Sequence, residues 1–322
     1  MDVHQFVTRD FVPENNFVMK SIFKVPALMF CLRVLILLLN PIQVQAQPFV
    51  DLFNAKVQFF SPQEYSSENS TQMGGYQAEA TFLLPMEQKN KDVILVGGDY
   101  TQLHFQTSGA IVSHSDLYST SLMLGADLGW KNPKWRTTVL ILPKINSDYK
   151  DISMEDAQLG GLAMLCFKKK ETLKYHFGIY YNREFFGDYF LPLLGIDWKI
   201  NEHINLFGDL PNNLNFEYKI SKSIYAGAAL YTCISSYRLS SATGGYYVRE
   251  GDKTMGHDEL KIYVNAYLSK HFVVYAEAGE TFYRTYTLYN NADELQHSAG
   301  IYRKSKDGMF VNTGIAYRFR LD

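Results

Sequence analysis

The sequence predicts an all-β protein, a closed antiparallel up-and-down transmembrane β-barrel of about twelve strands (range about 10–14) behind a cleaved signal peptide. Three observations carry this prediction: an apolar run near the N-terminus, apolar–polar alternation through the rest of the chain, and connections of alternating length. Aromatic residues make up 15% of the 322 residues, and Tyr and Phe favour half-buried strands and membrane interfaces. The formal net charge of -2 gives no reason to expect a nucleic-acid partner.

The N-terminal region has the three parts of a secretory signal peptide. Lys20 and Lys24 precede an apolar run from Val25 to Leu39, and Val44-Gln45-Ala46 offers small residues at the cleavage positions before Gln47. A transmembrane anchor is the alternative, but the run is short for a spanning helix. We therefore expect cleavage after Ala46.

This cleavage divides the chain into residues 1–46, an N-terminal extension and signal peptide, and residues 47–322, one outer-membrane β-barrel domain. The true start remains open between Met1, Met19 and Met29. Cys166 and Cys233 lie in strand-like segments without an obvious partner, so we expect no disulfide framework.

Alternation with a period of two predicts the strands. In Glu259–Leu268, for example, Leu260, Ile262 and Val264 oppose Lys261 and Tyr263. Within 93–104 and 273–284 the apolar set changes phase, which a β-bulge would explain. The predicted strands lie near 50–60, 76–85, 93–104, 117–130, 135–144, 158–168, 172–185, 189–200, 213–220, 223–235, 258–268, 272–284 and 309–321, with one more candidate at 204–210.

The predicted connections differ in length between the two ends of the strands. Short ones fall at 87–92, 131–134, 168–171, 201–203, 221–222 and 269–271, and long ones at 61–75, 105–116, 145–157, 237–257 and 285–307. This layout is typical of outer-membrane barrels. A secreted β-sandwich also alternates, but its strands are shorter, and strands can span hydrocarbon only as a closed barrel.

One stretch carries a resemblance to a known family. It includes Phe177–Gly187, Leu191–Gly195, Trp198 and Leu206–Pro211, and it ends near Tyr218. The chain resembles an uncharacterised family of outer-membrane β-barrel proteins of Gram-negative bacteria, a domain of unknown function. The final strand resembles the C-terminal signal read by the barrel-assembly machinery, although Leu321 and Asp322 follow Phe319 where an aromatic usually stands last. The resemblance implies location and architecture, and it carries no activity.

The polar faces of the strands predict a lumen lined by charges of both signs, which argues against strong ion selectivity. It would fit a narrow pore or a barrel filled by its own side chains. The expected lumen residues are Lys56, Gln58, Gln77, Glu79, Lys174, Glu184, Lys199, Glu217, Lys219, Glu259, Lys261, Arg318 and Arg320.

The histidines are the candidates for chemistry. His104 precedes Ser113-His114-Ser115-Asp116, but sequence adjacency does not supply the hydrogen-bond geometry of a catalytic pair. His176 lies on the expected lumen face, where a hydrogen-bond network is the simpler interpretation. His203, His271, His257 and His297 fall in turns or loops. We assign no catalytic, cofactor-binding or metal-binding residue.

The leading hypothesis is a non-enzymatic narrow pore for small solutes in the outer membrane. The alternatives are a hydrolase or lipid-modifying enzyme at the barrel rim, and a structural or adhesive barrel displaying 237–257 and 285–307. The expected partners are outer-membrane lipid and, during insertion, the barrel-assembly machinery.

If the signal-peptide interpretation is right, the mature protein begins at Gln47 and fractionates with the outer membrane, because the apolar run is too short for a stable anchor. N-terminal sequencing of the membrane-extracted protein identifies its first residue. A mature chain that retains Met1 or Met19 would show that the segment is not cleaved.

Overall fold

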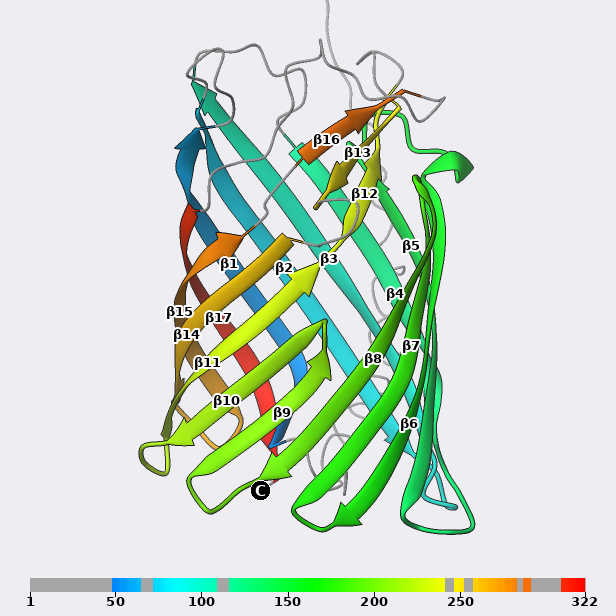
Figure 1. The fold of residues 1–322 in the computed structure, drawn as a ribbon, viewed down its shortest axis with the longest axis vertical. Coiled ribbons are helices and arrows are strands. Elements are labelled where there is room, and N and C mark those ends of the chain that lie inside the picture. The colour runs from blue at the N-terminus through cyan, green and yellow to red at the C-terminus, as the bar shows by residue number, and fades with distance from the viewer. Residues whose placement is uncertain are drawn as a thin grey trace, which may run out of the picture. The chain divides into compact units, whose positions relative to one another are not determined.

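The computed structural model describes residues 48–64, 72–108, 116–240, 246–251, 257–282, 286–290 and 308–321 (Figure 1). The predicted signal peptide, residues 1–46, lies outside these residues. The described residues form 17 strands and one 3-10 turn, η1 (Met154–Asp156). The strands are β1 (Phe49–Glu64), β2 (Gln72–Glu87), β3 (Val93–Ser108), β4 (Asp116–Gly129), β5 (Trp135–Ser147), β6 (Ala157–Lys170), β7 (Leu173–Glu184), β8 (Gly187–Lys199), β9 (Ile204–Leu210), β10 (Asn213–Lys219), β11 (Ile224–Cys233), β12 (Ser235–Arg238), β13 (Tyr247–Glu250), β14 (His257–Tyr267), β15 (Phe272–Phe282), β16 (Tyr286–Tyr289) and β17 (Gly308–Arg320).

Fourteen of these strands form a closed antiparallel wall. Strands β1 to β11 pair in sequence order, β11 pairs with β14, β14 with β15, and β15 with β17. The last strand then pairs with the first, with Phe53 opposite Tyr317 and Phe59 opposite Val311. The closed antiparallel barrel that the sequence predicts is confirmed. The strand count is close to the predicted twelve, and the 204–210 candidate is a wall strand.

The side-chain alternation explains why the wall closes without a register conflict. In β17 the even positions Phe310 and Asn312 are buried, whereas Met309 and Val311 are 69% and 55% exposed. The same pattern in β14 leaves Ile262 67% exposed on the outer face. Each strand therefore offers an apolar outer face to lipid and a separate inner face to the lumen.

The bulges expected in 93–104 and 273–284 are wrong. Strands β3 and β15 keep an unbroken register with both neighbours, and the irregularities lie instead at Asp51/Phe53, Phe60/Gln63 and Lys168/Lys170. The apolar phase changes because Leu103 and Val273 point inward and are 1% and 0% exposed. Both side chains pack in apolar clusters inside the barrel, whereas the alternation pattern predicts polar side chains at inward-facing positions.

The two ends of the barrel differ as predicted. Short turns at 88–92, 130–134, 171–172, 200–203, 220–223 and 268–271 form the turn end, where the C-terminus lies (Figure 1). The long connections lie at the opposite, loop end. Two short turns, at 185–186 and 211–212, also point toward the loop end. The turn at 211–212 joins β9 to β10 and lies well short of the loop end, because these two strands are short (Figure 1).

Three short strands form an inner sheet that the sequence did not predict. Strand β12 pairs with β13, and β13 pairs with β16, all antiparallel. They lie in or next to the two predicted long connections 237–257 and 285–307, whose display was one of the alternative hypotheses. The described parts of these connections instead lie inside the loop end of the barrel (Figure 1). None of the described segments is a helix of the length and apolarity that crossing a membrane requires.

Ile262→Arg should destabilise the inserted barrel by about 2–4 kcal/mol if this outward side chain lies near the bilayer midplane, because a charge there loses its hydration. Reversible unfolding from lipid vesicles, followed by tryptophan fluorescence, measures the difference. Ile262→Leu is the matched control and should change stability little.

Equal stability of the Ile262→Arg and Ile262→Leu proteins would mean that this face does not meet hydrocarbon. Lys261→Ala is not a neutral control, because the Lys261 ammonium binds Glu277 at 2.7 Å.

Candidate functional site: the lumen of the barrel

An apolar cluster joins the inner sheet to the wall at the loop end. Side chains of the inner segments pack against inward-facing residues of strands β1, β3, β4 and β17, and all are buried. The members are Phe60, Leu103, Phe105, Leu117 and Phe310 of the wall, with Tyr237, Leu239, Val248, Tyr286 and Leu288 of the inner segments. Burial and then the Glu250 carboxylate raise the pKa of the Tyr237 hydroxyl well above its usual value, so this hydroxyl stays neutral. The cluster narrows the mouth of the barrel.

Polar contacts hold β12 against the wall. The Glu184 carboxylate accepts hydrogen bonds from the backbone N–H of Ser236 at 3.0 Å and from its hydroxyl at 2.5 Å. Lys144 neutralises Glu184 at 3.1 Å, and the Asn146 amide donates to Ser235 Oγ and to the Ser236 carbonyl, each at 3.1 Å. These groups are almost fully buried, so each bond replaces one that water would otherwise make.

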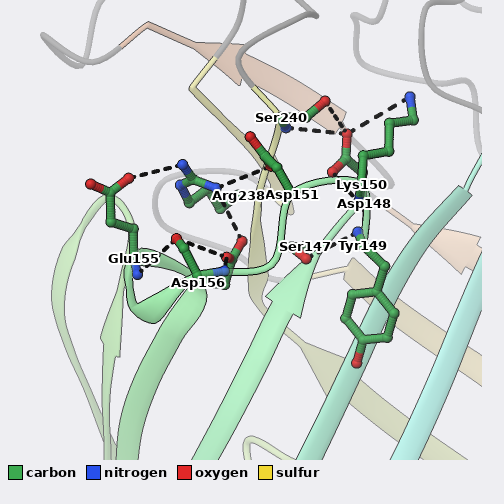
Figure 2. Close-up of polar contacts among 10 residues, drawn as sticks. Ser147, Asp148, Tyr149, Lys150, Asp151, Glu155, Asp156, Arg238 and Ser240 are labelled. Carbon is green, nitrogen blue, oxygen red and sulfur yellow. Dashed lines mark hydrogen bonds and ion pairs between the residues drawn. The ribbon is translucent and has the colours of Figure 1, made fainter.

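A second set of contacts fixes the end of β12 to the connection between β5 and β6 (Figure 2). The Arg238 guanidinium reaches Glu155 at 2.8 Å, Asp156 at 3.3 Å and Asp151 at 3.4 Å. Ser240 donates its hydroxyl to Asp148 at 2.9 Å. Turn η1 presents its acids to Arg238 because the Ser153 hydroxyl caps Glu155 N–H, and Asp156 in turn accepts the Ser153 N–H at 2.6 Å.

Below the inner sheet the barrel contains a cavity of about 480 Å³ with two chemically different walls. Strands β2, β3 and β4 contribute hydrogen-bonding groups: Gln77, Thr81, Asp99, Thr101, Ser119 and Ser121. Strands β4, β5, β6 and β8 contribute Met123, Leu142, Leu162, Met164, Leu191 and Leu193. Leu140, Leu162, Tyr180 and Leu191 are direct cross-strand partners, so this wall is a continuous apolar band.

A further cavity of about 450 Å³ adjoins the first one on the side of the turn end. Both are lined by Glu79, Thr81 and Tyr231, so they meet at that level. The lining of the second cavity combines asparagines and tyrosines with two ion pairs: Lys56 binds Glu79 at 3.0 Å, and Lys261 binds Glu277 at 2.7 Å. Together the two cavities extend from the inner sheet toward the turn end.

Two arginines narrow the lumen at the turn end. Arg318 binds the Asp51 carboxylate at 2.5 and 2.9 Å and lies 3.6 Å from the centre of the Phe49 ring. Arg320 binds the fully buried Glu217 at 2.7 Å. Asp51 and Arg318 belong to the first and last strands, so this pair also joins the seam of the barrel.

The expected lumen residues are brought together largely as oppositely charged pairs. Besides the pairs above, the Gln58 amide donates to Glu259 at 2.7 Å, and Lys219 lies 6.0 Å from the Tyr225 ring. Sequence alternation identified the lumen face, but it could not identify partners such as Asp51 and Glu277, which are distant in sequence.

The histidines have carboxylate or aromatic neighbours. His176 Nε2 lies 3.1 Å from Asp197, and its Nδ1 lies 2.8 Å from Asp209, as a lumen network predicts. His104 lies 2.8 Å from Asp116, and His257 lies 3.0 Å from Glu250. His203 stacks on Tyr218 and His271 on Phe319. Ser113, His114, Ser115 and His297 lie outside the described residues.

Among the residues that the structure describes, no group of three His, Cys, Asp or Glu side chains could hold a metal ion. Cys166 and Cys233 are free thiols. The site that the described residues do form is the lumen.

A closed antiparallel barrel with an apolar outer face and a polar lumen defines the class of outer-membrane β-barrels. Within this class, the chain belongs to the family "domain of unknown function (DUF6268)", whose model matches residues 42–318. None of the curated proteins matches the sequence.

The fold is similar to that of several solved outer-membrane proteins. An outer-membrane channel from Pseudomonas putida F1 is 9% identical, with a TM-score of 0.44 over 87% of this chain and 99% of the channel. The toluene transporter TbuX of Ralstonia pickettii is 11% identical, with a TM-score of 0.43 over 89% and 93%. The NanC porin is 6% identical, with a TM-score of 0.37 over 82% and 98%. These similarities concern the fold alone.

Arg238→Met should loosen the inner sheet, because Asp156, whose side chain is 1% exposed, would lose its buried cation. Breaking a buried ion pair by removing one partner typically costs about 3–5 kcal/mol. We expect faster protease cleavage within 239–246 in the folded, membrane-inserted protein. Arg183→Met, at an exposed position, is the control and should leave cleavage unchanged. Equal cleavage of both variants would mean that Arg238 does not hold the inner sheet.

Proposed function

We propose that this protein is an outer-membrane channel for small, largely uncharged solutes. The observation that carries the proposal is the pair of adjoining cavities, about 480 and 450 Å³, which extend from the inner sheet toward the turn end. A barrel filled by its own side chains would leave no such space. In the proposed orientation the long connections face outward and the short turns face the periplasm.

The charges of the lumen favour neutral solutes over ions. Ion-selective pores use rings of one sign, whereas here Lys56 is paired with Glu79, and Lys261 with Glu277. The cavity of about 480 Å³ below the inner sheet, here called the upper cavity, adds hydroxyl, amide and carboxylate groups on one wall and a leucine and methionine band on the other. A solute with one polar and one apolar side matches both walls, since each side would meet its own kind of surface.

The inner sheet would regulate passage. It lies at the loop end, packed into the apolar cluster and held by Glu184 and Arg238. Solute passage in this proposal requires a displacement of part of this sheet. Such a displacement would break a small number of polar bonds and leave the pairing of the wall strands intact.

The test is electrical recording from purified protein in planar bilayers. Wild-type protein should give discrete conductance steps, and Leu142→Trp, which fills the upper cavity, should reduce them about twofold or more because it narrows the lumen. Ile141→Trp is the matched control: the neighbouring side chain is 56% exposed on the outer face, so conductance should not change.

Folded wild-type protein that inserts and remains electrically silent would contradict a channel, provided that swelling of solute-loaded liposomes is absent as well. Equal conductance of the Leu142→Trp and Ile141→Trp proteins would show that the upper cavity is not on the conducting path.

A further inference from the structure

The wall is interrupted between β8 and β11. Strands β9 and β10 have seven residues each, whereas β8 has 13 and β11 has 10. Strand β9 pairs only with residues 194–199 of β8, so among the described strands residues 187–193 have a neighbour on the β7 side alone. Figure 1 shows this gap above the β9–β10 hairpin.

The backbone of β8 presents few bonding groups to this gap. Lys199 N–H donates toward β7, to Thr172, and Ile200 N–H donates toward β9, to Ile204, each at 2.9 Å. Because bonding direction alternates along a strand, Asp188, Phe190 and Pro192 direct their backbone toward the gap. Proline has no N–H to leave unpaired, and within sheets it is confined to edges, ends and bulges.

The upper cavity extends to the edges of the gap. Its lining includes Tyr189, Leu191 and Leu193 on the unpaired part of β8, Asn212 at the tip of the β9–β10 hairpin, and residues 231–235 at the end of β11. These three segments border the gap on the β8 side, below it and on the β11 side. The cavity that the proposed function uses therefore lies directly behind the gap.

The outer surface around the gap is apolar except at its loop end, where Asp188 is exposed. Phe190 and Leu194 on β8 are 59% and 64% exposed, Leu210 at the end of β9 is 43% exposed, and Leu230 on β11 is 46% exposed. Such side chains place the gap at the level of the hydrocarbon. An unpaired backbone group facing lipid costs several kcal/mol, and irregular backbone at this depth is tolerated where it lines a water-filled cavity.

We infer that the gap is a lateral window through which a small amphipathic molecule passes between the upper cavity and the outer half of the bilayer. This inference rests on the proposed channel function and specifies its route and solute class. The border of the window on the β8 side is apolar, at Leu191 and Leu193, while Asp99 and Ser121 offer hydrogen bonds on the opposite wall. A molecule can thus keep its polar end bonded while its apolar end enters the hydrocarbon.

The test asks whether lipid tails reach the inward-facing side of β8. Single tryptophans are placed in a protein whose native Trp130, Trp135 and Trp198 are replaced by Phe, and vesicles contain phospholipids brominated on the acyl chains. Leu191→Trp places the probe at the window. Leu162→Trp is the matched control, since Leu162 lies in the same inner band between two fully paired strands.

A lateral window predicts severalfold stronger quenching of the Leu191→Trp protein than of the Leu162→Trp protein, approaching that of outward-facing Phe190→Trp. Equal, weak quenching of both inward probes would overturn the inference. If the Leu191→Trp protein does not fold, Tyr189→Trp, a smaller change on the same segment of β8, replaces it as the probe. The quenching requires no solute flux, so a silent channel with strong quenching would contradict the proposed function and leave the window in place.

Discussion

The need to bond every backbone N–H and C=O within hydrocarbon governs this molecule. It explains the closed ring of fourteen strands, the pairing of Phe53 with Tyr317 at the seam, and the restriction of irregular backbone to the ends. The same requirement makes an interruption of the strand pairing informative. The segment 187–193 of β8, paired on the β7 side alone, borders the cavity of about 480 Å³ and includes a proline, so the wall departs from full pairing where the backbone cost is reduced.

Lipid requires apolar side chains on the outer face of the barrel, whereas the kind of side chain on the inner face varies along the barrel. It changes from an apolar cluster at the loop end, through a cavity with one polar and one apolar wall, to ion pairs at the turn end. Several of the buried charges have a counter-charge, as Glu184 has Lys144 and Glu217 has Arg320. Such pairing limits the cost of removing ions from water, and it leaves little net field to attract ions of one sign.

Much of the wall could be predicted from sequence because lipid imposes a strict period of two, which Ile262, Val264 and their neighbours display directly. The inner sheet could not, because four-residue strands such as β12 carry too short a pattern, and their partners come from separate connections. The same limit explains the mistaken bulges: Leu103 and Val273 are apolar on the lumen face because they meet groups that the local sequence does not reveal. The short strands β9 and β10 match the predicted 204–210 and 213–220, whereas the cavity depends on side chains that are distant in sequence, so local periodicity was insufficient for it.

The composition of the apolar cluster has a consequence for assembly. Its members come from the first, third, fourth and last wall strands, from the segment after β11 and from the segment after β15. No contiguous part of the chain contains enough of them to bury Tyr286 or Leu288, which are 0% exposed in the finished barrel. The apolar cluster at the mouth therefore cannot be completed until the first and last wall strands lie together.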